Sequence, residues 1–499
     1  MAARLSAVRE VLPGADLRGG DPTLGDVTHD SREVGPGALF CAVPGARTDG
    51  HDHAAAAVAA GAGAVLVERW LDLDVPQLRV PSVRAAMGPA AAVVHGRPAD
   101  DLLLLGVTGT NGKTTVVTLL ESVLARTGRG TGVVGTLGVR LHGATVPQDR
   151  TTPEAPVLQR LLRDLRTRGA DAVAMEVSSH GLALHRVDGI RFAVVGFTNL
   201  TQDHLDFHGD MAAYLAAKAR LFTPELADRG VVLLDAPGAD GIRAAARVPL
   251  VTVGATGADL GVRVREVGPD GGSAELLTPD GPVPVRTSLL GRHNLDNALL
   301  AAAMAVVAGL PAEAVAAGVA AAGPPSGRLE PVPAPAGAAA PRVLVDYAHT
   351  PDAVATAVAV GRDLTRGRVA VVLGAGGDRD RGKRRGMGAA AATADLAVVT
   401  DDNPRGEDPA AIRAEVLAGA VDAAGTAEVR EVADRADAIA AAVAWARPED
   451  VVLVLGKGHE TGQERAGRVL PFDDRVAAAS ALAARARGDV RPAVAGSAP

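Results

Sequence analysis

Cysteine is almost absent from this sequence, in which Cys41 is the single example among 499 residues. One cysteine cannot form an intrachain disulfide or a cluster of thiolate metal ligands, and this agrees with a reducing compartment. Aromatic residues make up only 2% of the chain. The sequence therefore offers little of the stacking surface that binders of single-stranded nucleic acids use. Its core must be packed from alanine, valine and leucine.

An excess of positive charge is also missing, because 51 lysines and arginines face 58 aspartates and glutamates, for a formal net charge of −7. This balance argues against a polyanion bound over a general basic surface. Apolar stretches of about eighteen residues are lacking, and the first residues have no apolar segment of a signal peptide. We therefore expect a cytoplasmic protein, monomeric, without a nucleic-acid or membrane partner.

The sequence does contain a regular alternation of short Val/Leu-rich runs with alanine-rich helical segments. A hydrophobic content of 47% with 22% charged residues is that of an ordinary globular chain. Such a length suggests more than one core. The alternation predicts doubly wound α/β domains with buried parallel strands. The predicted strands are 102–107, 172–177, 193–197, 231–234, 342–347, 368–374, 395–400 and 451–456.

Polar clusters recur at equivalent positions in this pattern, since each begins at the carboxyl end of a predicted strand. Open α/β sheets bind their ligands at that edge. Two breaks, at 95–101 and 321–328, divide the chain into three units. The clusters are TGTNGKTT, EVSSHG, TNLTQDHLDFH, DYAHTPD, GGDRDRGKR, DDNPR and GKGHE.

The first cluster lies within VTGTNGKTT, residues 107–115, and looks like a phosphate-binding loop. The usual pattern G-x-x-x-x-G-K-[ST] asks for glycine where this chain has Val107, so we assign Val107 to the strand and the cradle to residues 109–112. Main-chain N–H groups of such a turn, with the following helix N-terminus, attract anions. Lys113 would reach the terminal phosphates and the Thr114 hydroxyl would ligate Mg²⁺. A plain glycine-rich turn is the alternative.

Three further residues are candidates for a cation site beside this loop. Glu176 ends a buried strand, where a carboxylate must either be paired or hold a cation. His204 and His208 have the i, i+4 spacing of a two-histidine zinc site, which would still need a third ligand and a base. The alternative is a helix start at which Asp203 and Asp206 act only as caps. We favour a single histidine that assists magnesium near Glu176.

Lys218 lies in YLAAKARLF, which has the pattern of an amphipathic helix. A lone lysine in such a helix is usually a surface cation whose stem packs on apolar neighbours. A lysine buried near a metal can instead lose its proton and take up CO₂ as a carbamate that ligates magnesium. The residue types alone leave both interpretations open.

Charged residues also gather after the later strands. A cationic run in an acidic chain indicates an anionic small-molecule substrate. DDNPR and GKGHE combine Arg405 with Asp402 and Glu460, and opposite charges side by side suit a zwitterionic amino acid. A surface network of salt bridges is the alternative. The cationic run consists of Arg379, Arg381, Lys383, Arg384 and Arg385.

Together these motifs resemble those of the Mur ligases, over residues 30 to about 464. The resemblance implies an ATP-dependent amide ligase of three α/β domains. Residues 1–98 would bind the UDP end of the substrate, 99–325 would form a P-loop-type parallel-sheet domain for ATP, and 326–499 a Rossmann-like domain for the amino acid. The motifs that carry it are GTNGKTT, TTPE, EVSSHGLALHRV, FTNLTQDHLDFHG, YLAAKARLF, GRLE, VDYAHTPDA, GGDRDRGKR, DDNPR and GKGHE.

The resemblance also implies roles for individual residues. The catalytic positions would be Lys113, Glu176, His204 and Lys218, the last as a carbamate. The magnesium ligands would be Thr114, Glu176, His204 and carbamylated Lys218. ATP would be bound by Gly109, Thr110, Asn111, Gly112, Lys113, Thr114, Thr115, Asn294, Arg328 and Asp346. The UDP-muramoyl-dipeptide would be bound by Ser31, Thr151, Thr152, Ser178 and Arg186.

Within the family, DNPR is associated with meso-diaminopimelate rather than L-lysine. Arg379 and Arg405 could pair the distal carboxylate of diaminopimelate while Glu460 takes an ammonium group. The expected reaction is the ATP-dependent addition of this amino acid to UDP-MurNAc-L-Ala-D-Glu through an acyl phosphate. The residues expected at this site are Arg379, Asp402, Asn403, Pro404, Arg405, Gly456 and Glu460.

Several alternatives remain. An L-lysine-adding or folylpolyglutamate-type ligase would share the loop, and so would a P-loop ATPase of unrelated role or a non-catalytic nucleotide-binding partner. The sequence also departs from the family pattern at positions expected near uracil, adenine and peptide. These positions are His29, Leu184, Leu233, Ala236 and His293.

Overall fold

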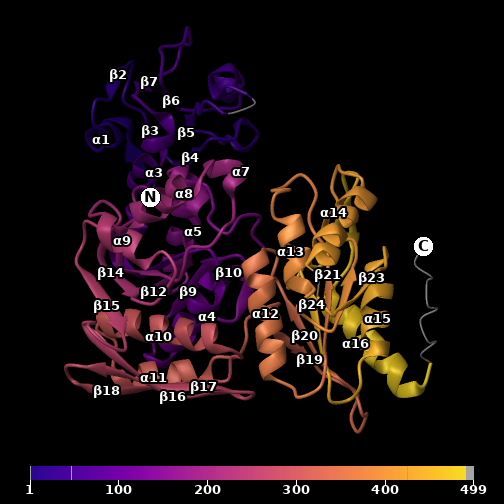
Figure 1. Ribbon diagram of the computed structural model, residues 1–499. Helices are drawn as coiled ribbons and strands as arrows, with labels where there is room; N and C mark the ends of the chain where they lie inside the picture. The colour runs from indigo at the N-terminus through magenta and orange to yellow at the C-terminus, as the bar shows by residue number, and fades with distance from the viewer. Residues whose placement is uncertain (1, 46–47, 424, 490–499) are drawn as a thin grey trace.

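The computed structural model describes residues 2–45, 48–423 and 425–489, which form three α/β parts built around separate sheets. In Figure 1 the first part lies above the second, and the third lies beside the second. The expected α/β class with a central parallel sheet and a further C-terminal sheet domain is confirmed. The domain ranges stay a prediction. In the part of the chain that the structure describes, no helix is long and apolar enough to cross a membrane.

The first sheet has the strand order β2-β7-β6-β5-β4, with the small pair β1-β3 beside it. Val27, Leu39, Leu66 and Leu78 lie along its strands, and α3 covers this apolar face. Its strands are β1 Ala3–Arg4, β2 Asp16–Arg18, β3 Thr23–Leu24, β4 Asp26–Thr28, β5 Ala38–Cys41, β6 Ala64–Val67 and β7 Gln77–Arg79. Its helices are α1 Leu5–Glu10, α2 Ala54–Ala59 and α3 Val83–Val94.

The central sheet has the order β11-β10-β9-β12-β8-β13-β14-β15-β16-β17-β18 and is parallel from β9 to β16. Helices α4, α10 and α11 cover one face, and α5, α8 and α9 cover the other. The strands are β8 Leu103–Thr108, β9 Thr131–Gly135, β10 Gly138–Leu141, β11 Ala144–Val146, β12 Ala172–Glu176, β13 Phe192–Phe197, β14 Ala227–Leu233, β15 Leu250–Gly254, β16 Leu260–Gly268, β17 Gly271–Thr278 and β18 Gly281–Thr287. The helices are α4 Lys113–Arg126, α5 Ala155–Thr167, α6 Ser179–Ala183, α7 Leu205–His208, α8 Met211–Ala219, α9 Ala239–Ala245, α10 Arg292–Val307 and α11 Ala312–Ala321.

The C-terminal sheet has the order β19-β20-β24-β21-β22-β23 and is parallel except for β19. Helices α12, α13 and α14 cover one face and α15 and α16 the other, so the sheet is doubly wound. The strands are β19 Glu330–Val332, β20 Arg342–Asp346, β21 Val369–Leu373, β22 Leu396–Val399, β23 Glu428–Glu431 and β24 Val451–Leu455. A separate antiparallel pair follows, β25 Gly462–Arg465 and β26 Arg468–Pro471. The helices are α12 Pro351–Asp363, α13 Arg384–Ala391, α14 Pro409–Asp422, α15 Arg435–Trp445 and α16 Asp474–Arg487.

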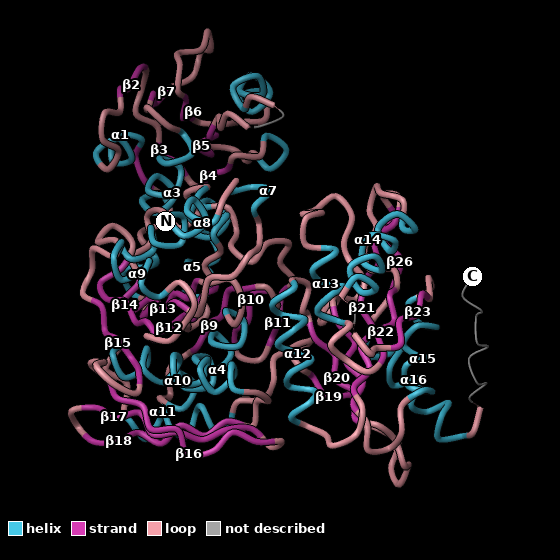
Figure 2. Tube along the Cα trace, in the orientation of Figure 1, coloured by secondary structure: helices cyan, strands magenta, loops and turns pink. Residues whose placement is uncertain are grey.

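All eight predicted strands are present, as β8, β12, β13, β14, β20, β21, β22 and β24. The largest difference is in β14, which begins at Ala227 rather than 231. The strands β16, β17 and β18, which pair antiparallel with one another, were not predicted. They form the lower edge of the sheet in Figure 2. Exposed residues interrupt their apolar pattern, so they lack the continuous hydrophobic runs of buried parallel strands.

A buried ion pair joins the last two helices of the C-terminal domain. Arg435 and Asp474, the first residues of α15 and α16, are both 0% exposed in their side chains. Two hydrogen bonds of 2.7 and 2.8 Å join them, and Arg435 also donates to the Leu455 carbonyl at 2.9 Å. This pair therefore holds the N-terminus of α15 against the N-terminus of α16.

We expect Asp474→Ala to lower the free energy of unfolding of the C-terminal domain by about 3–5 kcal/mol, because it leaves a buried arginine without its carboxylate. Urea unfolding of the full chain, followed by circular dichroism, measures this. The control is Arg487→Ala, which removes an exposed pair with Asp489 and should change stability by less than about 1 kcal/mol. Equal effects of the two variants would contradict the prediction.

Candidate functional site

The phosphate-binding loop lies between β8 and α4. Val107 pairs with Glu176 and Gly196 in the neighbouring strands, so it belongs to the strand. Gly109 and Gly112 have φ values of +145° and +87°, which favour glycine. A side chain at Gly109 would overlap Thr198, and one at Gly112 would overlap Asn297. The loop can therefore form only with glycine at these two positions.

Lys113, the first residue of α4, turns back over the loop. Its Nζ donates hydrogen bonds to the carbonyls of Gly109 at 2.9 Å and Thr110 at 2.8 Å. Burial lowers the pKa of Lys113, while the nearby Glu176 opposes that shift. The main-chain N–H of Asn111 donates to the Asn199 side chain at 3.0 Å. This segment after β13 thus fixes the shape of the loop.

The Glu176 carboxylate is paired with hydrogen-bond donors, which is one of the two possibilities that the sequence left open. Glu176 ends β12 and is 2% exposed. Its Oε1 accepts from the Thr114 hydroxyl at 3.0 Å and from the Thr136 N–H at 2.9 Å, and its Oε2 accepts from the Thr136 hydroxyl at 3.1 Å. A carboxylate oxygen offers about two acceptor sites. Oε2 therefore keeps capacity for a cation beside Thr114.

Lys218 is not a surface cation, because it is 1% exposed. Its Nζ donates to the Gly109 carbonyl at 2.7 Å and lies 4.3 Å from the centre of the Tyr214 ring. Burial, reinforced by the charge of Lys113, lowers the pKa of Lys218 well below its usual value. An amine that loses its proton readily is a nucleophile. Lys218 and Lys113 thus bond the same loop carbonyl.

His204 and His208 do not share a metal site. His204 precedes α7 in a left-handed conformation, with its Nε2 3.4 Å from Asp203. His208 Nε2 instead lies 3.0 Å from the Ser179 hydroxyl. Across residues 2–45, 48–423 and 425–489, no group of three or more His, Cys, Asp or Glu side chains is placed to hold a metal. This geometry does not support the zinc alternative.

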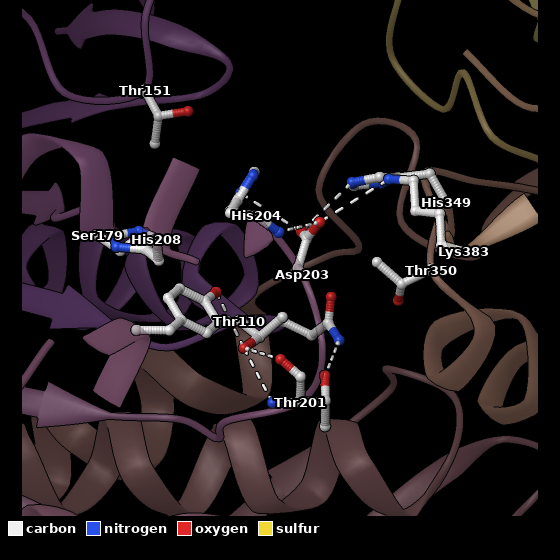
Figure 3. Close-up of polar contacts among 12 residues, drawn as sticks. Thr110, Thr151, Ser179, Thr201, Asp203, His204, His208, His349, Thr350 and Lys383 are labelled. Carbon is white, nitrogen blue, oxygen red and sulfur yellow. Dashed lines mark hydrogen bonds and ion pairs between the residues drawn. The ribbon is translucent and has the colours of Figure 1, made fainter. Parts of the chain in front are cut away.

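Asp203 does more than the capping role considered for it. It is buried, and it faces His204 together with two residues of the C-terminal domain, His349 and Lys383 (Figure 3). Burial raises the pKa of its carboxyl, but attraction to His349, His204 and Lys383 outweighs this and lowers the pKa overall. Burial lowers the pKa of His204 despite the neighbouring Asp203. A neutral imidazole is the form that ligates a metal.

A pocket of about 540 Å³ opens between the central and C-terminal domains, next to the loop. Its lining includes Gly112 and Thr114 from the loop and Asn294 from α10. Arg328 and Asp346 line it from the C-terminal side, and Arg328 donates to the Thr114 hydroxyl at 3.3 Å. The pocket thus gathers residues expected at the nucleotide from both domains.

Asp346 is held rigidly at this pocket. It accepts N–H groups of Leu329 and Ala348, each at 2.7 Å. Burial raises the pKa of Asp346, although Arg328 opposes that shift. Asn294 donates to the Leu290 carbonyl at 2.8 Å and accepts from Asn297 at 3.1 Å. Both side chains are therefore fixed before any ligand arrives.

Sequence reasoning missed the apolar wall of the pocket. Val253, in β15, and Leu299, in α10, line it, and the sequence analysis named neither residue. Three of the positions that depart from the family pattern also line it, namely Leu233, Ala236 and His293. Burial lowers the pKa of His293 to about 4. These three departures therefore change the lining of the pocket in which the nucleotide is expected.

The expected muramoyl-peptide residues form a chain of hydrogen bonds beyond Glu176. Thr151 bonds the Thr136 hydroxyl at 3.0 Å. Thr152 donates to the Glu176 carbonyl and accepts the Ser178 N–H, both at 3.0 Å. Arg186 donates to the Thr152 carbonyl at 3.2 Å. Ser31, in contrast, lies on the N-terminal domain at the start of a 3₁₀ turn.

A carboxylate that the sequence analysis did not single out orders this region. Glu154 is buried and pairs with Arg84 at 3.1 Å, with Arg186 at 2.9 Å, and with Arg150. Its position in TTPE was the available signal. His29 lies close by, and its buried Nδ1 has no hydrogen-bond partner among the described residues. The Glu154 cluster links the first two domains, because Arg84 lies on α3.

A second group lies at the carboxyl edge of the C-terminal sheet. Asn403 donates to Glu460 at 2.8 Å, and Lys457, which was not predicted, donates to Asn403 at 3.0 Å and Glu460 at 3.1 Å. A side chain at Gly456, with φ +117°, would come within 2.5 Å of Asp402. The structure therefore brings the DDNPR and GKGHE segments together.

A side chain at Gly376 would meet both Arg405, at 2.9 Å, and Arg379, at 3.9 Å. Arg405 has φ +51°, and it donates to the Gly377 carbonyl at 2.8 Å and pairs with Glu464 at 3.2 Å. Arg379 is exposed. The expected cationic run does not act as one site. Arg381 and Arg384 pair with Glu407, Arg385 pairs with Asp422, and Lys383 faces Asp203.

Known proteins are similar to this chain in sequence and in architecture. Residues 24–97 match the model of the Mur ligase family catalytic domain, 107–305 the Mur ligase middle domain and 327–458 the Mur ligase glutamate ligase domain. A UDP-N-acetylmuramoyl-L-alanyl-D-glutamate--2,6-diaminopimelate ligase of Streptomyces avermitilis is 46% identical over 93% of either chain.

Solved structures of ligases are also similar to this chain in fold. A structure of a ligase with the same name has a TM-score of 0.68 at 32% identity, over 97% of this chain and 99% of that one. The MurF ligase of Thermotoga maritima in complex with ADP has a TM-score of 0.61 at 21% identity, over 92% of this chain and 98% of that one. The latter likeness concerns the fold alone. Matching family models in all three parts, with a relative that covers nearly the whole chain, show that this protein belongs to the Mur ligase family.

Proposed function

We propose that this chain is an ATP-dependent, ADP-forming ligase that adds meso-2,6-diaminopimelate to UDP-MurNAc-L-Ala-D-Glu in cytoplasmic peptidoglycan precursor synthesis. One observation carries the proposal. The phosphate-binding loop and the C-terminal residues Arg328 and Asp346 line the same pocket. The name of the relatives that are 46% identical to this chain, a 2,6-diaminopimelate ligase, supports the choice of substrates.

ATP would lie in the pocket with its phosphates over residues 109–115. The ADP complex of the Thermotoga ligase, which shares the fold, supports nucleotide binding. Main-chain N–H groups and the α4 N-terminus would hold the phosphates, while Arg328 and Asp346 contact the nucleotide from the C-terminal side. Adenine would pack on the apolar wall formed by Val253 and Leu299.

The donors beside the loop suit magnesium. Three groups are of the types that bind a divalent cation. They are the free acceptor site of the Glu176 carboxylate, the Thr114 hydroxyl and the neutral imidazole of His204. The buried amine of Lys218 is suited to carbamylation, which would add oxygen donors. Bound magnesium would neutralise charge that develops on the phosphates.

The reaction would proceed in two steps. The terminal carboxylate of UDP-MurNAc-L-Ala-D-Glu attacks the γ-phosphorus of ATP, so that an acyl phosphate forms and ADP leaves. Lys113 stabilises the transferred phosphoryl group. The amine of diaminopimelate then attacks the acyl carbon, the C–O bond to phosphate breaks, and the amine loses its proton as the amide forms.

The two substrates would occupy the two polar groups described above. Thr151, Thr152, Ser178 and Arg186 would orient the peptide carboxylate, and Ser31 would contact the UDP end. On the C-terminal side, Arg379 and Arg405 would pair the distal carboxylate of the amino acid. The other proposed contacts there are Asp402, Asn403, Pro404, Gly456 and Glu460.

Phosphate release tests the reaction class. We expect release to depend on both UDP-MurNAc-L-Ala-D-Glu and diaminopimelate, because the amine must arrive before the acyl phosphate is consumed productively. A malachite-green assay with each substrate omitted in turn measures this. Full-rate release from ATP alone would favour the P-loop ATPase of unrelated role and contradict the ligase.

A further inference from the structure

Two side-chain bridges connect the central domain to the C-terminal domain near the loop. Arg328 reaches Thr114 at 3.3 Å, and both residues line the nucleotide pocket. The second bridge joins Asp203 to Lys383, and the lining of that pocket includes neither residue. The reaction scheme above assigns no role to this second bridge.

The position of Asp203 makes a partner from the other domain necessary. Its side chain is 7% exposed, and its Oδ1 accepts the N–H of His204 at 2.9 Å. A buried carboxylate is costly unless a cation or several hydrogen bonds compensate for the lost water. Lys383, just before α13 and 11% exposed, brings its Nζ to 3.8 Å from Oδ1. The domains in this arrangement supply the compensating charge.

In its neutral form, His349 cannot donate a hydrogen bond to Asp203. Its Nδ1 lies 2.8 Å from the Tyr347 carbonyl, so in the neutral ring Nδ1 carries the hydrogen and Nε2 is an acceptor. That Nε2 is 3.8 Å from Asp203 Oδ2, and two acceptors need a water molecule between them. Figure 3 shows both side chains approaching Asp203 from the C-terminal side. When His349 is neutral, the ammonium group of Lys383 is therefore the charged partner that the C-terminal domain offers to Asp203.

The distances from Asp203 to Lys383 and to His349, both 3.8 Å, exceed those of direct hydrogen bonds. A small approach of the C-terminal domain would shorten them, and the attraction grows as the ions come closer. Asp203 is also the residue before His204, the proposed magnesium ligand. Movement of the C-terminal domain is therefore coupled through one carboxylate to the edge of the phosphate site.

We propose that Asp203 is a positioning residue that, with Lys383, holds the C-terminal domain closed over the central domain during the reaction. The role in catalysis rests on the proposed function, because closure would protect the acyl phosphate from water until the amine attacks. Loss of the bridge should therefore release phosphate without forming an amide.

The test compares Asp203→Asn, Asp203→Glu, Lys383→Gln and the double variant Asp203→Asn/Lys383→Gln with the wild type. Phosphate and amide product are measured separately in the same reaction. In Asp203→Asn we expect kcat/KM for the amino acid to fall about tenfold and the phosphate-to-amide ratio to rise, since couplings between sites typically amount to 5–150-fold. KM for the UDP-dipeptide should stay within about twofold of the wild-type value, because the variant leaves the binding of this substrate unchanged.

The double variant should be no worse than Asp203→Asn alone, because both changes remove one interaction. Asp203→Glu, which keeps the charge, should recover part of the loss. Asp206→Asn is the matched control, since Asp206 is exposed in the same segment, and it should behave as the wild type. Additive losses in the double variant, or an unchanged phosphate-to-amide ratio, would overturn the proposal.

Small-angle scattering separates this proposal from the proposed function. With the ATP analogue AMPPNP and magnesium, the wild type should contract more than Asp203→Asn and Lys383→Gln. Equal radii of gyration for the wild type and the two variants would contradict a role of the Asp203–Lys383 bridge in closure. If the wild type contracts but forms no amide, the proposed reaction is wrong while the bridge stands.

Discussion

Replacing Lys218 by alanine is expected to lower kcat for phosphate release by about 10³-fold, the loss typical of removing one group that stabilises the charge of a transition state. The Lys218 amine bonds the carbonyl of Gly109 inside the phosphate-binding loop, and it is buried against Tyr214. As a carbamate it would offer negative oxygens as ligands to magnesium beside the phosphates, and alanine would remove that ligand. Steady-state kinetics with all three substrates measures the effect.

Lys218→Met is the matched control, because methionine fills the space that alanine leaves open. Both variants should lose activity, but added formate or acetate should restore part of it only in Lys218→Ala, where a small carboxylate can enter. Thermal unfolding of both variants shows whether the fold is retained. Activity of Lys218→Ala within about tenfold of the wild type would rule out a carbamate role, since charge stabilisation is worth more than that.

The preference of the enzyme for meso-diaminopimelate over L-lysine should be a larger effect than the loss of activity in Lys218→Ala. We expect kcat/KM for L-lysine to be about 10⁴-fold below that for meso-diaminopimelate, because a site built for a charged group rejects an analogue that lacks it. Arg405 is held in place by the Gly377 carbonyl and by Glu464. Lysine would bring no distal carboxylate to this guanidinium, which would lose water without gaining a partner.

Arg405→Ala should reduce this discrimination by lowering the rate with diaminopimelate far more than the rate with lysine. Arg385→Ala is the control, because Arg385 lies in the same cationic run but pairs with Asp422 away from the site. Competition between the two amino acids, with products separated by mass spectrometry, measures both variants. Comparable rates for lysine and diaminopimelate in the wild type would indicate the L-lysine-adding member of the family instead.

Strand positions and the phosphate-binding loop were accessible from the sequence because they depend on local patterns. Continuous Val/Leu runs marked β8, β12 and β13, and the glycines of the loop occupy conformations that other residues avoid. The antiparallel edge β16–β18 was missed, because a run of exposed residues in β16 and alternating exposure in β18 weaken the hydrophobic signal. The apolar wall at Val253 and Leu299 was missed because a residue that lines a pocket resembles a core residue in sequence.

The sequence by itself determined the α/β class, the loop with its strand and helix, and the family motifs at the strand ends. The tertiary structure decided which charges meet. Lys218 is buried against Gly109 rather than exposed, His204 and His208 face different partners, and the cationic run divides among separate carboxylates. Strand periodicity and turn geometry act between neighbours in the chain. Burial and ion pairing depend on distances between residues that only the folded chain brings together.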